Sequence, residues 1–360
     1  MPADINEILA HYQTQINECL EAFFDQRIKE AAVISAYTRE VAANAREYTL
    51  RGGKRLRPIF CIYGYKCFSD DHVEAIIAAS ISLELMQSYL LIHDDVMDKD
   101  TLRRGKPTFH IVCKALGERL FGTTGNNKTL NFGENIAIVA GDLLEAYGEE
   151  VLATSPFESE YVKKAVAKYA EMVKKVGYGQ ILDITAGLNE RITEDEILLI
   201  HKLKTASYTI EGPLHIGALL AGASEADLQI LSTYGVPLGV AFQIQDDILG
   251  LFGSEEKTGK PVGSDIREGK RTLLIFHALQ RCTDEEKKVL QKALGNPHVT
   301  LEEIERIRDI VRGTGSLDYS KAIVDELTVR AVQAINKAPF RTEAKDFLIR
   351  IADFIGTREY

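Results

Sequence analysis

Two acid-rich peptides, far apart in the chain, each place a pair of aspartates within an otherwise apolar run. The first is DDVMD at residues 94–98 and the second is DDILG at residues 246–250. Burying carboxylates is unfavourable unless cations or hydrogen bonds compensate for the lost hydration. Two such pairs suggest a bound divalent cation, and a cation held by carboxylates alone suggests a phosphorylated substrate.

The first acid cluster has the spacing of a magnesium site. On a helix with about 3.6 residues per turn, Asp94 and Asp98 project from the same face. Mg²⁺ prefers hard oxygen ligands and retains water, so two carboxylates plus phosphate oxygens suit it. Asp95 points elsewhere and is expected to orient the ligands from behind them. A solvated acidic helix end is the alternative interpretation of this cluster.

The second acid cluster lacks one acid of the first. Asp246 and Asp247 are followed by Gly250 at the position that Asp98 occupies in the first cluster. We therefore expect the second site to bind metal more weakly, or to share its metal with the first.

Basic residues accompany both acid clusters. The peptide GGKRLRP at residues 52–58 places glycines, whose amides can approach an anion closely, beside several cations. Lys54 and Arg57 face the same way if this segment opens a helix. RRGKP follows the first acid cluster, and Lys260 and Lys270 follow the second. The pattern predicts a basic, diphosphate-binding cavity, although each peptide alone is also compatible with an ordinary basic turn.

The composition excludes several other classes. A formal net charge of −10 argues against a general nucleic-acid binder. Five cysteines without a CxxC pair indicate a reducing compartment and no zinc site. No signal peptide is visible at the N-terminus, so we expect a cytoplasmic protein. The longest apolar run, residues 74–93, contains Glu84 and Gln87, which favours a buried core helix over a membrane span.

Helical periodicity dominates the chain, and strand signals are almost absent. Thr193 with Glu196, and Thr300 with Glu303, form the capping boxes that open helices. Residues 122–133 are expected to form a loop. No Pro/Ser-rich linker divides the chain, so the sequence predicts one all-α domain spanning residues 1–360.

Taken together, these peptides resemble the motifs of the trans-isoprenyl diphosphate synthases, also called polyprenyl synthetases. Their order and spacing match that family across about residues 50–275. The first motif, with two residues between its acids, most resembles archaeal-type short-chain geranylgeranyl diphosphate synthases. The matching peptides are GGKRLRP (52–58), DDVMD (94–98), RRGKPTFH (103–110), GQILD (179–183), KT (204–205), FQIQDDILG (242–250) and GKPVGSDIREGK (259–270).

The resemblance implies an isoprenoid synthase fold, with helices around a deep central cavity, and a homodimer. It also implies three Mg²⁺ ions, two on Asp94 and Asp98 and a third on Asp246. The substrates would be isopentenyl diphosphate and an allylic diphosphate such as dimethylallyl, geranyl or farnesyl diphosphate. The residues implied for substrate binding are Gly53, Lys54, Arg57, Gln87, Arg104 and Lys270.

The implied mechanism is ionisation, condensation and elimination. Arg103, Lys204 and Lys260 neutralise the departing diphosphate. The carbonyl of Thr205 and the amide oxygen of Gln243 stabilise the allylic cation, and water is excluded because it would quench that cation. In relatives that make geranylgeranyl diphosphate, a residue such as Gly250 is commonly tolerated.

Product length depends on the apolar residues before the first acid cluster. Tyr89 lies five residues before Asp94, about 7.5 Å along a helix, and in the family this position forms part of the floor that stops chain growth. Leu90 leaves the cavity less shallow than a second aromatic would, and Met86 lies one turn beyond Tyr89. We favour a twenty-carbon over a fifteen-carbon product, with a farnesyl or a bifunctional synthase as the alternative.

Two other functions share parts of this pattern. A terpene cyclase has the same fold and the same metal-binding acids, but it binds no second substrate diphosphate. The basic peptides GGKRLRP and RRG suggest a site for such a second diphosphate, and they therefore argue against a cyclase. A non-catalytic partner subunit of a heteromeric synthase usually loses acids from the first motif, and DDVMD is intact here.

Overall fold

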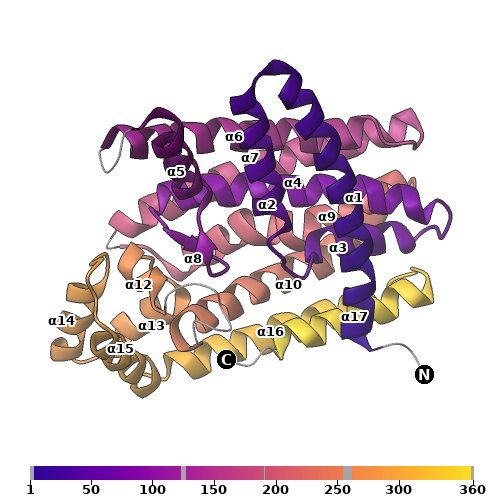
Figure 1. Cartoon of the computed structure of the whole chain (residues 1–360). Helices are drawn as coiled ribbons and strands as arrows, with labels where there is room; N and C mark the ends of the chain where they lie inside the picture. The colour runs from indigo at the N-terminus through magenta and orange to yellow at the C-terminus, as the bar shows by residue number, and fades with distance from the viewer. Residues whose placement is uncertain (1–3, 123–126, 190, 254–261, 358–360) are drawn as a thin grey trace.

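A computed structural model of the chain describes residues 4–122, 127–189, 191–253 and 262–357. Long helices α4, α6, α7, α10 and α16 run across the molecule, and the α1–α2 hairpin crosses them (Figure 1). The short helices α12–α15 gather at one end. The described part of the chain is therefore almost entirely helical, which confirms the all-α prediction.

The helices before the second acid cluster are α1 (Ile5–Ile34), α2 (Ala36–Leu50), α3 (Leu56–Lys66), α4 (Val73–Met97), α5 (Phe109–Phe121), α6 (Asn127–Ala153), α7 (Ser159–Leu188), α8 (Glu194–Ile200), η1 (His201–Glu211) and α9 (Gly212–Leu220). The remaining helices are α10 (Glu225–Phe252), α12 (Ser264–Glu268), α13 (Leu273–Arg281), α14 (Asp284–Ala293), α15 (Leu301–Gly313), α16 (Ser316–Asn336) and α17 (Thr342–Gly356).

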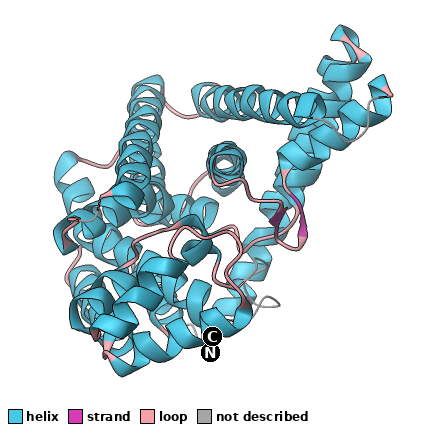
Figure 2. Cartoon of the chain, turned by 90° about the vertical axis from the view of Figure 1, so that its left-hand side faces the viewer, coloured by secondary structure: helices cyan, strands magenta, loops and turns pink. Residues whose placement is uncertain are grey.

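One short antiparallel ribbon, which was not predicted from the sequence, interrupts the helices. Strands β1 (Leu102–Arg103) and β2 (Lys106–Pro107) pair with Arg103 opposite Lys106 (Figure 2). Arg104 and Gly105 form the turn between them, both with positive φ, and such backbone is typical of a tight hairpin. The ribbon carries Arg103 at the end of β1 and Arg104 in the turn, so the two arginines follow each other directly.

Local signals in the sequence set several helix boundaries correctly. Thr193 and Thr300 each accept a hydrogen bond from the backbone of the glutamate three residues later, and both capping boxes are complete. The expected loop at residues 122–133 is partly wrong, because α6 already begins at Asn127. Gly133 lies inside that helix, where it packs against the carbonyl of His110, and a Cβ would come within 2.3 Å of that oxygen.

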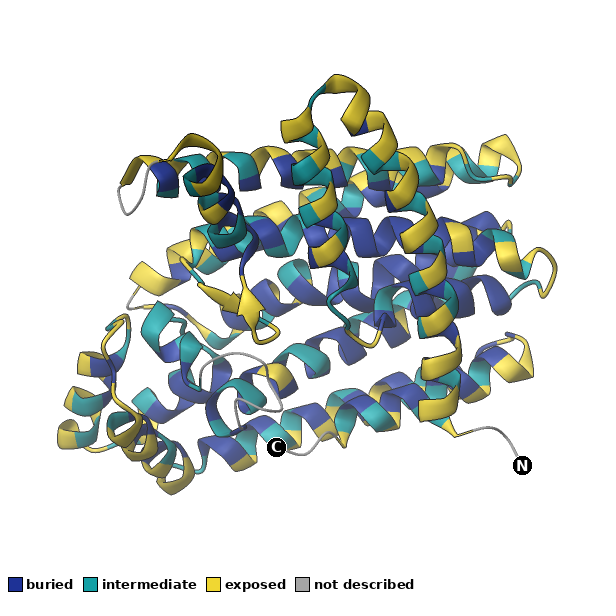
Figure 3. Ribbon diagram, in the orientation of Figure 1, coloured by how far each residue is buried: buried dark blue, intermediate teal, exposed yellow. Residues whose placement is uncertain are grey.

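Helix α4 is the central helix of the core. By length and composition it is the one described helix that would suit a membrane span, but 72% of its most apolar window is buried inside the protein. Figure 3 shows it as a largely buried element covered by surrounding helices. Helices α3, α6 and α9 pack directly on it, as expected for the core helix predicted from residues 74–93.

A π-helical segment, η1, lies between α8 and α9. The N–H of Gly212 donates to the carbonyl of Ser207, five residues earlier, so the turns are wider than in an α-helix. Segments of this kind are frequent at functional sites. Helices α7 and α10 pack on η1, so the helices that carry the predicted KT and DDILG motifs lie against each other.

Candidate active site

A cavity of about 670 Å³ lies among α3, α4, η1, α10 and α12. Most of the predicted site residues line it, although they come from seven separate peptides. The structure brings together Gly53, Lys54, Arg57, Gln87, Asp94, Arg103, Arg104, Lys204, Thr205, Gln243, Asp246 and Lys270 around this one cavity. Lys260 lies outside the described residues.

The two acid clusters face the same space. Asp94 lies in the last turn of α4 and Asp246 lies on α10, and both line the cavity. Asp98 caps α4, with its N–H bonded to the carbonyl of Asp94 at 2.8 Å. Acids of both clusters therefore line one cavity, whereas Asp98 is not among the residues that line it.

Asp95 bonds to Tyr48 and Arg103, and its expected role in orienting the metal ligands stays a prediction. It is fully buried. Its carboxylate accepts a hydrogen bond from the hydroxyl of Tyr48 at 2.7 Å and another from Nε of Arg103 at 2.5 Å. Burial raises the pKa of Asp95 and outweighs the opposing effect of Arg103. The carboxylate thus holds the Arg103 guanidinium, whose Nη2 lies 3.7 Å from Asp94.

Lys204 is held between two carboxylates. Its Nζ lies 2.6 Å from Oδ2 of Asp183 on α7 and 3.4 Å from Oδ1 of Asp94. Burial alone would lower the pKa of Lys204, but Asp94 and Asp183 outweigh it and raise that pKa. The lysine is therefore fully charged at neutral pH.

Helix α7 also fixes the backbone of this lysine. Gly179 lies one turn before Asp183, and a Cβ at residue 179 would come within 2.5 Å of the Lys204 nitrogen. Only glycine lets α7 and η1 approach this closely. Both ends of Lys204 are thus positioned by residues of the GQILD motif, Gly179 at the backbone and Asp183 at the ammonium group.

Lys270 occupies the equivalent place beside Asp98. Its Nζ donates to Oδ2 of Asp98 at 3.0 Å, and it also pairs with Glu268. Burial opposes the charge of Lys270, but Asp265, Glu268 and Asp98 raise its pKa well above the usual value. Oxygen atoms of Asp98, Asp100 and Glu268 lie within 4.8 Å of one another, so this edge of the site offers further hard ligands.

The basic loop before α3 differs from the expected geometry. Helix α3 begins at Leu56, so Lys54 lies in the preceding loop rather than on a helix face with Arg57. Gly53 has positive φ, and a Cβ there would come within 2.9 Å of the Arg104 guanidinium. Arg104 in turn donates to the carbonyl of Gly52. The glycines therefore allow the second arginine of the ribbon to pack against the loop.

Arg57 and Gln87 complete this side of the cavity. Nη2 of Arg57 donates to the hydroxyl of Thr209 at 2.8 Å, and its guanidinium lies 4.3 Å from the ring centroid of Tyr208. Gln87 is buried, and its Oε1 has no hydrogen-bond partner among the described residues. Arg57 on α3 and Gln87 on α4 both line the cavity.

A buried ion pair supports the basic loop. Nη1 of Arg55 donates to Glu84 at 2.6 Å, Nε donates to Asn17 at 2.9 Å, and Nη2 donates to the carbonyl of Thr49 at 3.0 Å. Arg55 has a left-handed backbone with φ 52°. The pair thus fixes the chain where it turns from the glycines into α3.

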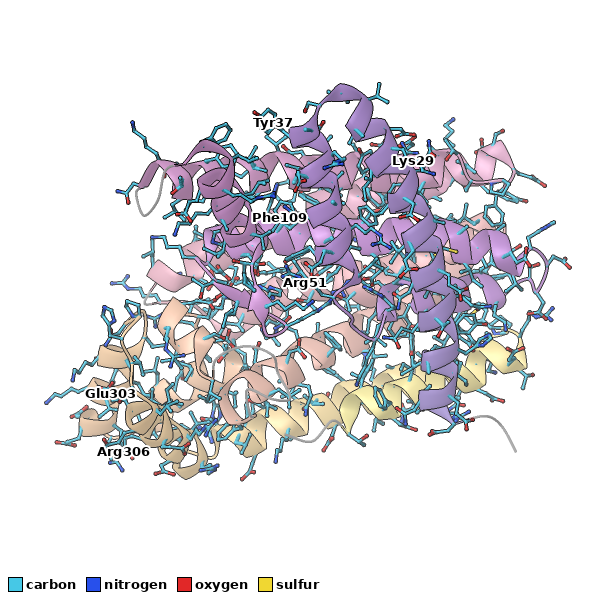
Figure 4. All side chains as sticks on the ribbon, viewed as in Figure 1. Lys29, Tyr37, Arg51, Phe109, Glu303 and Arg306 are labelled. Atoms are coloured by element: carbon cyan, nitrogen blue, oxygen red, sulfur yellow. The ribbon has the colours of Figure 1, made fainter. Side chains whose placement is uncertain are left out.

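Arg51 joins α2 to the arginine ribbon. This residue, labelled in Figure 4, donates through Nη1 to the carbonyl of Pro107 at 2.5 Å and through Nε to Glu47 at 2.7 Å. Its guanidinium also lies 5.0 Å from the ring centroid of Tyr48. The ribbon and the Asp95 network are therefore tied to the same helix end.

The three residues expected to control product length lie on α4 outside the cavity lining. Met86 is fully buried, and Tyr89 and Leu90 are half-buried. The Tyr89 ring packs edge-on against His93, with centroids 4.9 Å apart. His93 Nε2 lies 2.9 Å from the carbonyl of Ile138 on α6, so this part of α4 faces α6. The role of these residues in product length stays a prediction.

Residues 39–311 match the polyprenyl synthetase family. The chain belongs to that family. The predictions of this family and of a prenyltransferase enzyme are confirmed.

Individual relatives of this polyprenyl synthetase match over most of their length. The geranylgeranyl diphosphate synthase of Sulfolobus acidocaldarius is 36% identical, covering 81% of this chain and 82% of that relative. The short chain isoprenyl diphosphate synthase of Methanocaldococcus jannaschii is also 36% identical, with 88% and 89% covered. The crystal structure of geranylgeranyl pyrophosphate synthase from Corynebacterium glutamicum, complexed with isoprenyl diphosphate and magnesium, superimposes with a TM-score of 0.91 at 31% identity, covering 97% and 99%. The isoprenoid synthase fold is therefore confirmed.

Several residues of this polyprenyl synthetase's cavity were not selected from sequence. Asp265 lies within the GSDIREGK motif, and its Oδ2 is 2.9 Å from the position that a Cβ on Gly250 would take. Asp183 and Glu84 also line the cavity. The motifs containing Asp265 and Asp183 were recognised, but which acid in each motif faces the cavity depends on how the helices pack.

Proposed function

We propose that this polyprenyl synthetase is a Mg²⁺-dependent prenyltransferase that makes a short all-trans prenyl diphosphate, geranylgeranyl diphosphate. It condenses isopentenyl diphosphate with dimethylallyl, geranyl or farnesyl diphosphate. The observation that carries this proposal is the convergence of two acid clusters and two separate groups of cations on one cavity. The printed names of the relatives from Sulfolobus and Methanocaldococcus support the same product class.

The two groups of cations fit two diphosphates. Lys54, Arg57 and Arg104 lie on the side formed by the basic loop and the ribbon, with Gln87 beside them, and these residues would bind isopentenyl diphosphate. Arg103, Lys204 and Lys270 lie among the acids and would bind the allylic diphosphate. Lys260, outside the described residues, would join them. A terpene cyclase has no use for the first group.

The chain's acids fit magnesium. Asp94, Asp98 and Asp246 offer only carboxylate oxygens, and Mg²⁺ prefers such hard ligands. We infer three ions, two held by Asp94 and Asp98 and a third by Asp246. When bound, magnesium neutralises the charge that accumulates on the leaving diphosphate. The magnesium named with the Corynebacterium relative supports this inference.

The basic side chains would then promote ionisation of the allylic substrate. Arg103 and Lys204 would stabilise the diphosphate as its carbon–oxygen bond breaks, because both are charged, half-buried and held by carboxylates before the reaction. The allylic carbon is left positive, and the Thr205 carbonyl and the Gln243 amide oxygen would stabilise it. The double bond of isopentenyl diphosphate attacks that carbon, and the released diphosphate takes the proton whose loss forms the new double bond.

Replacing Tyr89 with alanine is expected to lengthen the products. Removing this ring from α4 opens space between α4 and α6 along the direction in which the prenyl chain would grow. Chromatography of the dephosphorylated products measures the change. Tyr89→Phe keeps the ring and serves as the matched control, and an unchanged product profile in Tyr89→Ala would place the floor of the cavity elsewhere.

Restoring the missing acid of the second motif is expected to weaken magnesium binding. Asp265 already occupies the space beside Gly250, so we propose that it supplies the carboxylate that the motif lacks. In Gly250→Asp, two carboxylates would compete for that space, and the half-saturating Mg²⁺ concentration should rise by about tenfold. Gly250→Ala is the control for bulk alone. Tighter Mg²⁺ binding by Gly250→Asp would show that Asp265 does not fill this role.

We propose a homodimer in the cytoplasm, with residues 1–360 forming a single domain. Exposed apolar side chains on α5 and α6 support a subunit interface there, since such clusters favour burial. They are Leu120, Phe121, Ile138, Val139 and Leu143. The Phe121 ring also stacks on Tyr37, which is labelled at the tip of the α1–α2 hairpin in Figure 4.

One assay tests the function and its alternatives. The purified protein alone is incubated with Mg²⁺, isopentenyl diphosphate and each allylic starter, and the products are separated after dephosphorylation. A twenty-carbon product is expected. A fifteen-carbon product would identify a farnesyl synthase, and both together would identify a bifunctional enzyme. No condensation with any starter would favour a non-catalytic partner subunit.

A further inference from the structure

Four polar side chains from two packed helices form a connected set at the cavity wall. His201 and Thr205 lie four residues apart on η1, and Gln243 and Asp247 lie four apart on α10. Oγ1 of Thr205 donates to Oε1 of Gln243 at 2.6 Å, and Nε2 of Gln243 donates to Oδ1 of Asp247 at 2.7 Å. Nε2 of His201 lies 3.3 Å from Oδ2 of Asp247. All four residues line the cavity.

The mechanism above leaves two members of this set without a role. The side chains of His201 and Asp247 are each only 8% exposed. Among the described residues, neither Oδ2 of Asp247 nor Nδ1 of His201 has a hydrogen-bond partner. A buried carboxylate with so little compensation lowers stability, which points to a functional reason for it.

Asp247 controls which way the Gln243 amide points. The two ends of a glutamine amide have nearly the same shape, but one end only accepts hydrogen bonds and the other only donates. A carboxylate only accepts, so Asp247 requires the NH₂ group of Gln243 on its side. The amide oxygen is then turned toward Thr205, and it keeps one lone pair after accepting the threonine hydroxyl.

The orientation matters because the two ends of the amide have opposite polarity. A carbonyl oxygen stabilises a nearby positive carbon, whereas an N–H group directed at the same carbon destabilises it. We propose that Asp247, with the His201 ring beside its other carboxylate oxygen, is a positioning residue that fixes the Gln243 amide with its oxygen toward the site where the allylic cation forms. This inference rests on the proposed function, since it assigns a role within the same reaction.

Asp247→Asn is the first test, because asparagine has the same shape but no longer fixes the amide. Asparagine offers both a donor and an acceptor, so the Gln243 amide can adopt either orientation. We expect kcat to fall by about 100-fold, the usual effect of losing one aligned dipole at a reacting centre. The KM values for both diphosphates and the half-saturating Mg²⁺ concentration should not change.

A double-mutant cycle with Gln243→Ala then separates positioning from other roles. If Asp247 acts only through Gln243, adding Asp247→Asn to Gln243→Ala causes no further loss of kcat. Losses that multiply in the double variant would overturn the proposal. A raised half-saturating Mg²⁺ concentration in Asp247→Asn would also overturn it, because Asp247 would then bind metal directly.

His201 supplies a conservative pair of variants. Glutamine can place an amide nitrogen near the position of the histidine Nε2, so His201→Gln should keep most of the activity that His201→Leu loses. His277→Leu is the matched control, since His277 is equally buried but lies outside the cavity lining, and its kcat should stay unchanged. Equal losses of kcat in the two His201 variants would show that the histidine does not hold Asp247.

Thermal unfolding of each variant and the activity of the wild-type enzyme distinguish the possible outcomes. Thermal unfolding identifies any loss of activity that comes from misfolding, and only folded variants enter the cycle with Gln243→Ala. A wild-type enzyme that makes no prenyl diphosphate would overturn the proposed function. An active wild-type enzyme with an equally active Asp247→Asn variant would overturn only the positioning role.

Discussion

Replacing Asp94 with asparagine is expected to lower kcat for prenyl transfer by about 1,000-fold, which corresponds to roughly 4 kcal/mol of transition-state stabilisation. Asp94 lies at the centre of the acidic side of the cavity, 3.4 Å from the Lys204 ammonium and 3.7 Å from the Arg103 guanidinium. The asparagine keeps the shape but removes the charge on which both metal binding and cation placement depend. Steady-state kinetics over a range of Mg²⁺ concentrations measures the effect.

The control for Asp94→Asn is Asp325→Asn, which makes the same change on the exposed surface of α16. This control should retain wild-type kcat and Mg²⁺ dependence. Wild-type activity in Asp94→Asn would show that the first acid cluster does not hold the metal, and the proposed mechanism would then be wrong.

Breaking the buried Arg55–Glu84 pair should give the largest loss of stability. The side chains of Arg55 and Glu84 are 1% and 5% exposed, so Glu84→Gln leaves a buried guanidinium without its countercharge. Removing one partner of such a pair typically costs about 3–5 kcal/mol. Urea unfolding, followed by circular dichroism, measures the change in the free energy of unfolding.

The double variant Arg55→Met with Glu84→Leu distinguishes the pair from the site it occupies. Two apolar side chains of similar size leave no buried charge, so much of the stability lost in Glu84→Gln should return. If the double variant is less stable than Glu84→Gln alone, the hydrogen bonds from Arg55 to Asn17 and Thr49 contribute more than the ion pair does.

The helical part of the fold could be predicted well because its signals are local. Apolar spacing identified α4 as a core helix, and the two capping boxes gave the first residues of α8 and α15. The ribbon at 102–107 was not predicted, because each of its strands has two residues and lacks an alternating pattern. The start of α6 was also missed, since asparagine and glycine favour loops locally but tertiary packing on α5 overrides that preference.

The residues of the candidate site could be predicted from the sequence, but the ion pairs and contacts between their side chains could not. The motifs gave the residues around the cavity, since each motif is short and continuous in sequence. The pairings of Lys204 with Asp183 and of Lys270 with Asp98 join residues from segments far apart in the chain, so no spacing in the sequence contains them. The carboxylate of Asp265 beside Gly250 likewise depends on how α12 packs on α10.

Helix α7 holds Lys204 at both its backbone and its ammonium group. Gly179 fixes the peptide end and Asp183 fixes the ammonium end, so the flexible four-carbon chain between them has little freedom left to lose. Such a side chain is preorganised: it loses its conformational entropy when the protein folds, so little is lost when a ligand binds. An arginine, longer and planar at its tip, would not fit between the same two fixed points even though it carries the same charge.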